Sequence, residues 1–409
     1  MKIAVLGYGV VGSGVVELMF KNAQSIAKNA KENIEVKYVV DIREFPGDPY
    51  EKLFIKDFEQ VLHDKEIETV VEVIGGLNPA YSFVKRSLAA GKSVVTSNKE
   101  LVATYGHELL QLAKEKNVNF MFEASVGGGI PIIRPLSQCL AANRINRIYG
   151  ILNGTTNYIL SKMITEGDDF SAALKKAQEH GYAEANPAAD IDGIDACRKI
   201  AILGSLAYGF HIDPNSVQTE GIRNLDLQDV KYAASAGFSI KLLGLVSHKD
   251  DEKIHIIVAP FLVEKDANIS SVQGVFNEIV VEGDAVGETM FYGRGAGKLP
   301  TASAVVADVI DCCKHRNARK YLYWDKQQDN MVVDFKMEES SFYVRFSCDN
   351  ISALSVAVKD AFSVDKIIEQ VDEYVAILSP VCEHDFYEKI AEISAETGAV
   401  LKAKYRVFK

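Results

Sequence analysis

A short apolar strand that runs directly into a glycine-rich turn opens this 409-residue chain. Residues 2–6 read KIAVL, residues 7–12 read GYGVVG, and residues 15–30 have the composition of a helix. In such a unit the glycines permit a tight turn, close approach of the backbone to a pyrophosphate and close helix packing, and the helix amino terminus attracts phosphate. We therefore predict a dinucleotide-binding Rossmann domain; the alternative is a glycine-rich turn in an unrelated α/β unit. The residues expected at the cofactor are Gly7, Gly9, Val10, Val11 and Gly12.

The alternation of strands and helices continues and predicts an α/β fold with a doubly wound parallel sheet. Strands are expected at 34–40, 69–74, 93–96 and 119–122, and a helix at 79–90. The carboxyl ends of parallel strands line the cofactor crevice of such a sheet. Two residues that directly follow strands, Gly75 and Ser97, are therefore expected beside the cofactor.

The second strand ends where a Rossmann fold carries its cofactor selector. Asp41 favours NAD, because a carboxylate there binds the ribose hydroxyls, whereas Arg43 favours NADP, because an arginine pairs with the extra phosphate. Asp41 also lies further from Gly12 than the usual spacing of about 20 residues. The choice between the two cofactors stays open.

Lys99 is expected in the first turn of a helix that begins at this crevice. A cation at the amino-terminal end of a helix opposes the macrodipole, so its presence beside a redox site indicates catalysis. The alternative is a surface lysine balanced by Glu100.

The richest polar segment is residues 181–199, GYAEANPAADIDGIDACRK. A helix is expected to begin near Gly193, which places Asp195 and Lys199 one turn apart on the same face. A lysine held by an aspartate can polarise a carbonyl or move a proton. The alternative is a solvated salt bridge within the helix.

Two further loops carry polar groups. In residues 123–131, EASVGGGIP, main-chain carbonyls can curl round a small cation with Glu123 supplying the charge, and such oxygen ligands suit sodium, magnesium or calcium; the alternative is a domain hinge. A helix is expected to follow, to about Ala142. After a strand at 147–152, Asn153, Gly154 and Thr155 can hold a polar substrate.

Composition limits the class of protein. The chain is 48% hydrophobic and 25% charged, with a net charge of −11, which argues against nucleic acid as a partner. Its six cysteines lack metal-binding spacing, and no apolar run of about 18 residues indicates a membrane span. We expect a cytoplasmic protein that acts on a small molecule.

Taken in order, six motifs resemble homoserine dehydrogenases across about residues 1–320. They are GYGVVG, TSNKELVA, FEASVGGGIPII, GILNGTTNYIL, the block from GYAE to DIDGIDACRK, and GRGAGKLPTASAVVADV. The resemblance implies reversible NAD(P)-linked interconversion of aspartate 4-semialdehyde and L-homoserine, in threonine, methionine and isoleucine biosynthesis, by a homodimer or homotetramer.

The resemblance also implies roles for single residues. Lys99 and Lys199 would handle protons, Asp195 would orient Lys199, and Glu184 and Asp190 would bind polar groups of the substrate. Asn153, Gly154 and Thr155 would lie beside the substrate, and Gly297 beside the nucleotide. A sodium-like ion would be held by Glu123 and by main-chain oxygens of Val126, Gly128 and Ile130.

The remaining sequence suggests three domains. We expect a dinucleotide-binding domain at 1–130 plus a returning helix at about 299–320, and a mixed α/β substrate and dimerisation domain at 131–298. A linker at 321–339 then precedes a module at 340–409 whose strands and helices follow the βαββαβ order of an ACT regulatory domain. That family's turn before the first helix carries a glycine, which Ile351 and Ser352 replace here. We therefore expect assembly rather than strong threonine inhibition from this module, and some activity in a chain that ends near Gln328.

Two other functions are the alternatives to homoserine dehydrogenase activity. Aspartate-semialdehyde dehydrogenase would need a nucleophilic cysteine, and Cys139 and Cys197 lie in no such motif. A regulator that binds nucleotide and amino acid without turnover would be favoured if Lys99 or Lys199 pointed away from the pocket.

Overall fold

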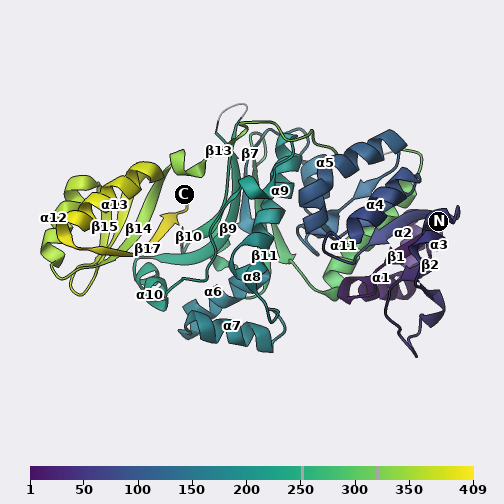
Figure 1. Cartoon of the computed structure of the whole chain (residues 1–409), viewed down its shortest axis with the longest axis horizontal. Helices are drawn as coiled ribbons and strands as arrows, with labels where there is room; N and C mark the ends of the chain where they lie inside the picture. The colour runs from purple at the N-terminus through teal and green to yellow at the C-terminus, as the bar shows by residue number, and fades with distance from the viewer. Residues whose placement is uncertain (250–252, 319–321) are drawn as a thin grey trace. The chain divides into compact units, whose positions relative to one another are not determined.

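The computed structural model describes residues 1–249, 253–318 and 322–409. The chain divides into two compact units (Figure 1), and each unit is built from segments that are distant in sequence. Unit 1 comprises Met1–Ile148, Arg198–Ser216 and Ile279–Asp329, and unit 2 comprises Tyr149–Cys197, Val217–Glu278 and Asn330–Lys409.

Unit 1 contains a six-stranded, fully parallel sheet in the order β3-β2-β1-β4-β5-β6. The chain begins in the middle of the sheet, runs to one edge and then returns to the other side of β1, which is the doubly wound order that we predicted. The switch point lies between β1 and β4. The strands are β1 (Lys2–Leu6), β2 (Glu35–Val40), β3 (Phe54–Ile55), β4 (Ile67–Glu72), β5 (Ser93–Thr96) and β6 (Phe120–Met121).

Helices connect and cover these strands. The single helix expected at 15–30 is two helices that break at Asn22. The returning helix expected at about 299–320 is α11, which packs on α1 and ends earlier, at Lys314. A β-carbon at Gly14 would lie 2.9 Å from Lys298 Cγ, so the glycine permits this close approach. The helices are α1 (Val10–Lys21), α2 (Ala23–Ala30), α3 (Phe58–His63), α4 (Ala80–Ala89), α5 (Lys99–Lys116) and α11 (Lys298–Lys314).

A second sheet has eleven strands in the order β12-β11-β7-β9-β10-β17-β14-β16-β15, with β8 and β13 beside β10. None of the strands between residues 218 and 294 is predicted from the sequence. The reason is clearest in β10, where only the last of eleven residues is exposed, because burial of both faces removes the alternation that marks a strand. These strands are β7 (Ile145–Ile151), β8 (Gln218–Thr219), β9 (Phe238–His248), β10 (Ile254–Glu264), β11 (Phe276–Gly283), β12 (Gly287–Arg294) and β13 (Val332–Val333).

The helices between residues 154 and 235 carry much of the polar chemistry. The expected helix to about Ala142 is wrong, because only a short π-helical turn forms at Pro135–Cys139. A helix does begin just after Gly193, as the sequence predicted. The helices are α6 (Gly154–Glu166), α7 (Phe170–Glu179), α8 (Ala188–Ile191), α9 (Ile194–Tyr208) and α10 (Leu227–Ser235).

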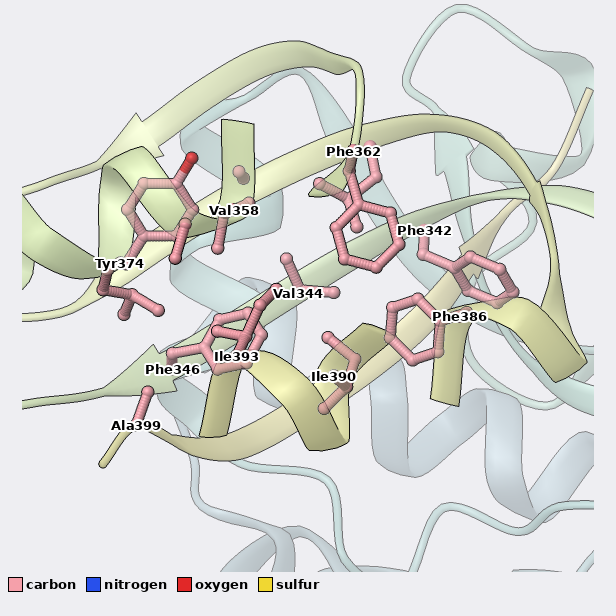
Figure 2. Close-up of a cluster of buried hydrophobic side chains, with 14 residues drawn as sticks. Phe342, Val344, Phe346, Val358, Phe362, Tyr374, Phe386, Ile390, Ile393 and Ala399 are labelled. Carbon is pink, nitrogen blue, oxygen red and sulfur yellow. The ribbon is translucent and has the colours of Figure 1, made fainter. Parts of the chain in front are cut away.

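The carboxyl-terminal segment has the predicted order of strands and helices. Figure 2 shows side chains of β14, α13 and the end of α12 meeting in one apolar core, where the rings of Phe342 and Phe386 lie 4.7 Å apart. The elements are β14 (Glu339–Ser347), α12 (Ile351–Ala361), β15 (Val364–Glu369), β16 (Tyr374–Cys382), α13 (Glu383–Thr397) and β17 (Val400–Val407).

This segment shares the eleven-stranded sheet. β17 pairs in parallel with β10 through Phe261 and Leu262, and the N–H of Phe408 donates to the Leu262 carbonyl at 2.8 Å. The Phe408 ring lies 4.7 Å from the ring of Tyr149. The carboxyl-terminal strand is therefore joined to unit 2 by backbone pairing and by this aromatic contact. Within the described ranges, no helix is long and apolar enough to cross a membrane.

Candidate functional site

In the glycine-rich turn after β1, backbone segments pack tightly against each other. Gly7 has a φ of +96°, and a β-carbon at Gly12 would lie 2.0 Å from the Gly7 carbonyl oxygen. Neither position accepts a larger residue without a shift. Gly9 precedes the first residue of α1, Val10, and provides no side-chain cap. The first N–H groups of α1 are thus available to an anion such as a pyrophosphate.

Asp41 and Arg43, which favour different cofactors, form a salt bridge with each other. The guanidinium donates to both carboxylate oxygens, with Nε to Oδ1 at 3.0 Å and NH2 to Oδ2 at 2.8 Å. The backbone N–H of Tyr8 also donates to Asp41 at 2.7 Å. These bonds, with that of Arg43 the largest cause, lower the pKa of Asp41 to about 2. Asp41 is therefore an anion that fastens the glycine-rich turn to the end of β2.

Glu72, at the end of β4, is a residue that sequence reasoning missed. Its carboxylate is buried and accepts from the backbone N–H groups of Ile74 at 2.8 Å and Gly75 at 3.2 Å, and from the Thr96 hydroxyl at 2.6 Å. Burial raises the pKa of Glu72 despite these donors. Glu72 could have been recognised from the sequence, because it is an acidic residue at the end of an apolar strand. Glu72 joins the loops after β4 and β5, which contain the predicted cofactor residues Gly75 and Ser97.

Lys99 is the first residue of α5, as the sequence predicted. Asn98 caps the helix by accepting from the Leu101 N–H at 3.1 Å, and its amide donates to the Gly76 carbonyl at 2.5 Å. The Glu100 carboxylate, which the alternative interpretation paired with Lys99, forms an ion pair with Arg198 at 2.7 Å. This ion pair brings the residue before Lys199 to the first turn of α5, so two candidate lysines belong to adjoining helix turns of unit 1.

In unit 2, one amide joins two carboxylates of the acidic segment. Asn153 Nδ2 donates to Asp190 at 2.7 Å and to Asp195 at 2.8 Å, while Asn153 Oδ1 caps α6 through the Thr156 N–H at 2.8 Å. Asn153 and Asp195 are both buried. The two acids thus form one preorganised anionic site, and Lys199 follows Asp195 by one turn of α9.

The rest of the predicted substrate turn is also constrained. A β-carbon at Gly154 would lie 2.7 Å from the Val275 carbonyl oxygen, so this position requires glycine. The Thr155 hydroxyl donates to the Tyr182 carbonyl at 2.7 Å. Glu184 is exposed, and only its backbone carbonyl takes part in a described bond, from Gln178 at 3.1 Å.

A buried lysine that contacts α6 was not recognised from the sequence as a residue of this site. Lys241 in β9 is 0% exposed and donates to Asn157 Oδ1 at 3.2 Å and to the Val272 carbonyl. Burial lowers its pKa to about 8, with Glu278 opposing the shift. Asn157 in turn donates to three carbonyls of residues 272–276. This network fixes the loop against α6, and the apolar sequence around Lys241 gave no sign of it.

Glu123 is buried at the predicted cation loop and is engaged by backbone. Its carboxylate accepts the N–H groups of Ile132 at 2.6 Å, Ile133 at 2.8 Å and Arg134 at 2.9 Å. Gly128 has a φ of +56°, and a β-carbon there would lie 2.2 Å from the Gly295 carbonyl oxygen. The turn at 127–130 therefore packs directly on the segment that leads to Gly297, the residue before α11, whose φ is +122°.

Comparison with known proteins matches both the nucleotide-binding half and the middle of the chain. Residues 7–123 match the family model described as "Homoserine dehydrogenase, NAD binding domain", and residues 131–310 match the model "Homoserine dehydrogenase". The chain belongs to the homoserine dehydrogenase family. The homoserine dehydrogenase of Synechocystis sp. is 48% identical over 318 residues, which cover 76% of this chain and 73% of that protein.

Solved homoserine dehydrogenases share the fold. The structure from Thiobacillus denitrificans has a TM-score of 0.92 and 36% identity, and the match covers 100% of this chain and 98% of that chain. A hyperthermophilic archaeal homoserine dehydrogenase in complex with NADPH has a TM-score of 0.65 and 29% identity, and the match covers 76% of this chain and 97% of that one.

Membership of the homoserine dehydrogenases confirms the predicted activity. The chain is an NAD(P)-dependent oxidoreductase that interconverts aspartate 4-semialdehyde and homoserine, a step of amino-acid biosynthesis. Neither alternative, an aspartate-semialdehyde dehydrogenase nor a regulator without turnover, fits these matches.

Proposed function

We propose that this homoserine dehydrogenase works through two lysines and a carboxylate site joined by Asn153. Bound NAD(P) supplies the hydride for reduction of the aldehyde carbon. Lys199 donates the proton that the developing alkoxide needs, and Asp195, one turn earlier in α9, orients Lys199. Lys99 assists this proton transfer from the first turn of α5.

Asp190 and Glu184 bind the ammonium group of the amino-acid substrate, and Gly154 and Thr155 lie beside its polar groups. The observation that carries the proposal is the double donation of Asn153 to Asp190 and Asp195. An amide that donates both of its hydrogens to carboxylates favours their charged forms, and charged carboxylates bind an ammonium group.

Replacement of Asp190 tests this arrangement. Asp190→Asn removes a charge-assisted bond worth about 1.5–3 kcal/mol, so we expect KM for aspartate 4-semialdehyde to rise roughly tenfold or more. The measurement is steady-state oxidation of NADPH and NADH. Glu166→Gln, at the far end of α6 where Glu166 pairs with Lys162 and Lys176, is the matched control with unchanged KM. An unchanged KM in Asp190→Asn would remove Asp190 from substrate binding.

We also propose that Arg43 selects between the two nicotinamide cofactors. The Asp41 carboxylate is 7% exposed and engaged by Arg43, whereas the Arg43 side chain is 58% exposed and can turn toward a 2′-phosphate. The glycine-rich turn, Gly75, Ser97 and Gly297 would complete the nucleotide site.

The cofactor proposal predicts a change in the ratio of KM values. Arg43→Ala should weaken NADPH and free Asp41 for ribose hydroxyls, so we expect the KM ratio of NADPH to NADH to rise about tenfold, which corresponds to about 1.4 kcal/mol. Asp41→Ala should shift the ratio in the opposite direction. Cofactor titrations of both variants provide the measurement, and an unchanged ratio in each would place the selector elsewhere.

A monovalent cation of the sodium type would be held by Glu123 and the main-chain oxygens of Val126, Gly128 and Ile130. The oxygen donor set suits such a hard ion; Glu123 Oε2 accepts one backbone N–H, and the Arg134 Nε lies 3.9 Å from the same oxygen. Among the described residues, no group of three or more His, Cys, Asp or Glu could hold a metal. Main-chain oxygens would therefore supply most of the ligands.

For residues 340–409 we propose an ACT-like module that contributes to assembly as a homodimer or homotetramer. Its strands lie in the order β17-β14-β16-β15, so that the first and last strands are neighbours, as in the βαββαβ fold. Asn350 caps α12 by accepting from the Ala353 N–H at 3.0 Å, where the sequence lacks the glycine of an ACT ligand turn. We expect inhibition by threonine to be weak for this reason.

A further inference from the structure

A buried arginine near the chain end joins two carboxylates from distant segments. Arg406 in β17 is 1% exposed, and its NH2 group donates to Glu220 Oε1 at 2.9 Å and to Glu383 in the first turn of α13. Its guanidinium lies 5.6 Å from the centre of the Phe335 ring. Because a buried cation requires partners, Arg406 holds both carboxylates in place.

Glu220 belongs to a short segment whose backbone is fixed at several points. Its N–H donates to the Val258 carbonyl at 2.7 Å, directly after β8. Burial raises the pKa of Glu220, but the bond from Arg406 and its charge outweigh that effect, and the pKa is lowered overall. Glu220 is therefore charged at neutral pH and held between Arg406 and the central strand β10.

The residues after Glu220 press against the end of α8. A β-carbon at Gly221 would lie 2.2 Å from the Ile191 carbonyl oxygen and 2.6 Å from Asp192 Cα, and the Ile222 N–H donates to the Ile191 carbonyl at 2.8 Å. The Gly221 backbone therefore packs directly against the end of α8, and close-packed contacts transmit a displacement. Residues 219–222 thus pack against the end of α8 and fix its position.

Asp190 lies one residue before this contact. Its carboxylate accepts from Asn153, which also donates to Asp195. A series of direct contacts within unit 2 therefore leads from Arg406 through Glu220 and the Gly221 backbone to the carboxylates proposed to bind the substrate.

We propose that Arg406 and Glu220 are positioning residues for the amino-acid substrate, which they influence by fixing the end of α8 and hence the Asp190 carboxylate. This inference rests on the proposed role of Asp190. It assigns to the last strand of the chain a task in substrate binding that is separate from any effector.

The test is Glu220→Gln, which keeps the size of a partly exposed side chain and removes its charge. We expect KM for aspartate 4-semialdehyde to rise about fivefold, with kcat and the nucleotide KM within about twofold of wild type. Glu166→Gln is again the matched control, because it makes the same change at a carboxylate of unit 2 that pairs with Lys162 and Lys176, and it should leave the substrate KM unchanged.

A double-mutant cycle separates positioning from a general loss of packing. If Glu220 acts through Asp190, the KM of Glu220→Gln combined with Asp190→Asn should equal that of Asp190→Asn alone within about twofold, because coupled residues are not additive. Independent, multiplied effects would overturn the inference, as would an unchanged KM in Glu220→Gln when Asp190→Asn raises it. An Asp190→Asn variant with normal KM would overturn the proposed role of Asp190 as well.

Discussion

Lys199→Ala is expected to lose at least about a hundredfold in turnover while it binds NADPH and NADH with wild-type affinity. Loss of a positioned general acid costs about 10²–10⁴-fold, and Lys199 is buried in α9 one turn after Asp195. Steady-state turnover and nucleotide titration by fluorescence provide the two measurements. Urea unfolding of each variant shows whether the fold is retained.

Lys199→Arg makes this test sharper, because it keeps the positive charge. An arginine side chain stays protonated at any accessible pH and cannot give up its proton. We expect Lys199→Arg to be as impaired as Lys199→Ala if the proton matters, and near normal if only the charge matters. Lys175→Ala, at a side chain that is 77% exposed in α7, should be fully active. Near-normal turnover in Lys199→Ala would exclude the lysine from proton transfer.

Removal of residues 330–409 is expected to abolish activity by unfolding unit 2. Asp229 in α10 is 1% exposed, and its carboxylate is bound by Arg345 Nε at 2.7 Å and by the hydroxyls of Tyr343 at 2.8 Å and Tyr405 at 3.5 Å. The deletion removes all three of these partners together with the packing that covers this side of α10. Loss of β17 also exposes one edge of β10 and the ring of Tyr149.

We expect the combined loss of this network and of the packing on β10 to exceed the stability of unit 2, because a typical domain has only about 5–15 kcal/mol. Urea unfolding of residues 1–329 should lack the transition of unit 2, and turnover should fall below about one hundredth. Arg345→Met removes one partner of Asp229 from the full-length chain and should shift the unfolding midpoint without abolishing activity. If the shortened chain kept turnover within about tenfold of wild type, residues 330–409 would be dispensable for catalysis, as the sequence had led us to expect.

The parts of the molecule that sequence reasoning found are those with local signals. A strand followed by glycines and a helix defines β1 and α1, and the order of strands and helices after residue 340 was also predicted. The second sheet left little trace, because β10 is apolar on both faces and pairs with segments far away in sequence. Periodicity cannot reveal such pairing.

In the site, too, the features with local sequence signals were predicted and those that depend on tertiary contacts were not. Asp195 and Lys199 follow from helical spacing, and Asn153 was recognised as a substrate residue. That Asn153 joins Asp190 to Asp195 depends on tertiary structure, as do the pairing of Asp41 with Arg43 and the bonds of Glu72. Buried polar residues such as Lys241 have apolar neighbours in the sequence. Their structural role becomes clear only from their hydrogen-bond partners in the folded protein.

The packing of α11 on α1 affects how the chain folds while it is being translated. The six strands of the first sheet are complete at Met121, but the helix that contacts Gly14 begins only at Lys298. At translation rates of about 5–20 residues per second, the intervening segment takes on the order of ten seconds or more to emerge from the ribosome. During that time the apolar face of α1 that α11 later covers is open, so the nascent nucleotide-binding domain should be a substrate for chaperones until late in synthesis.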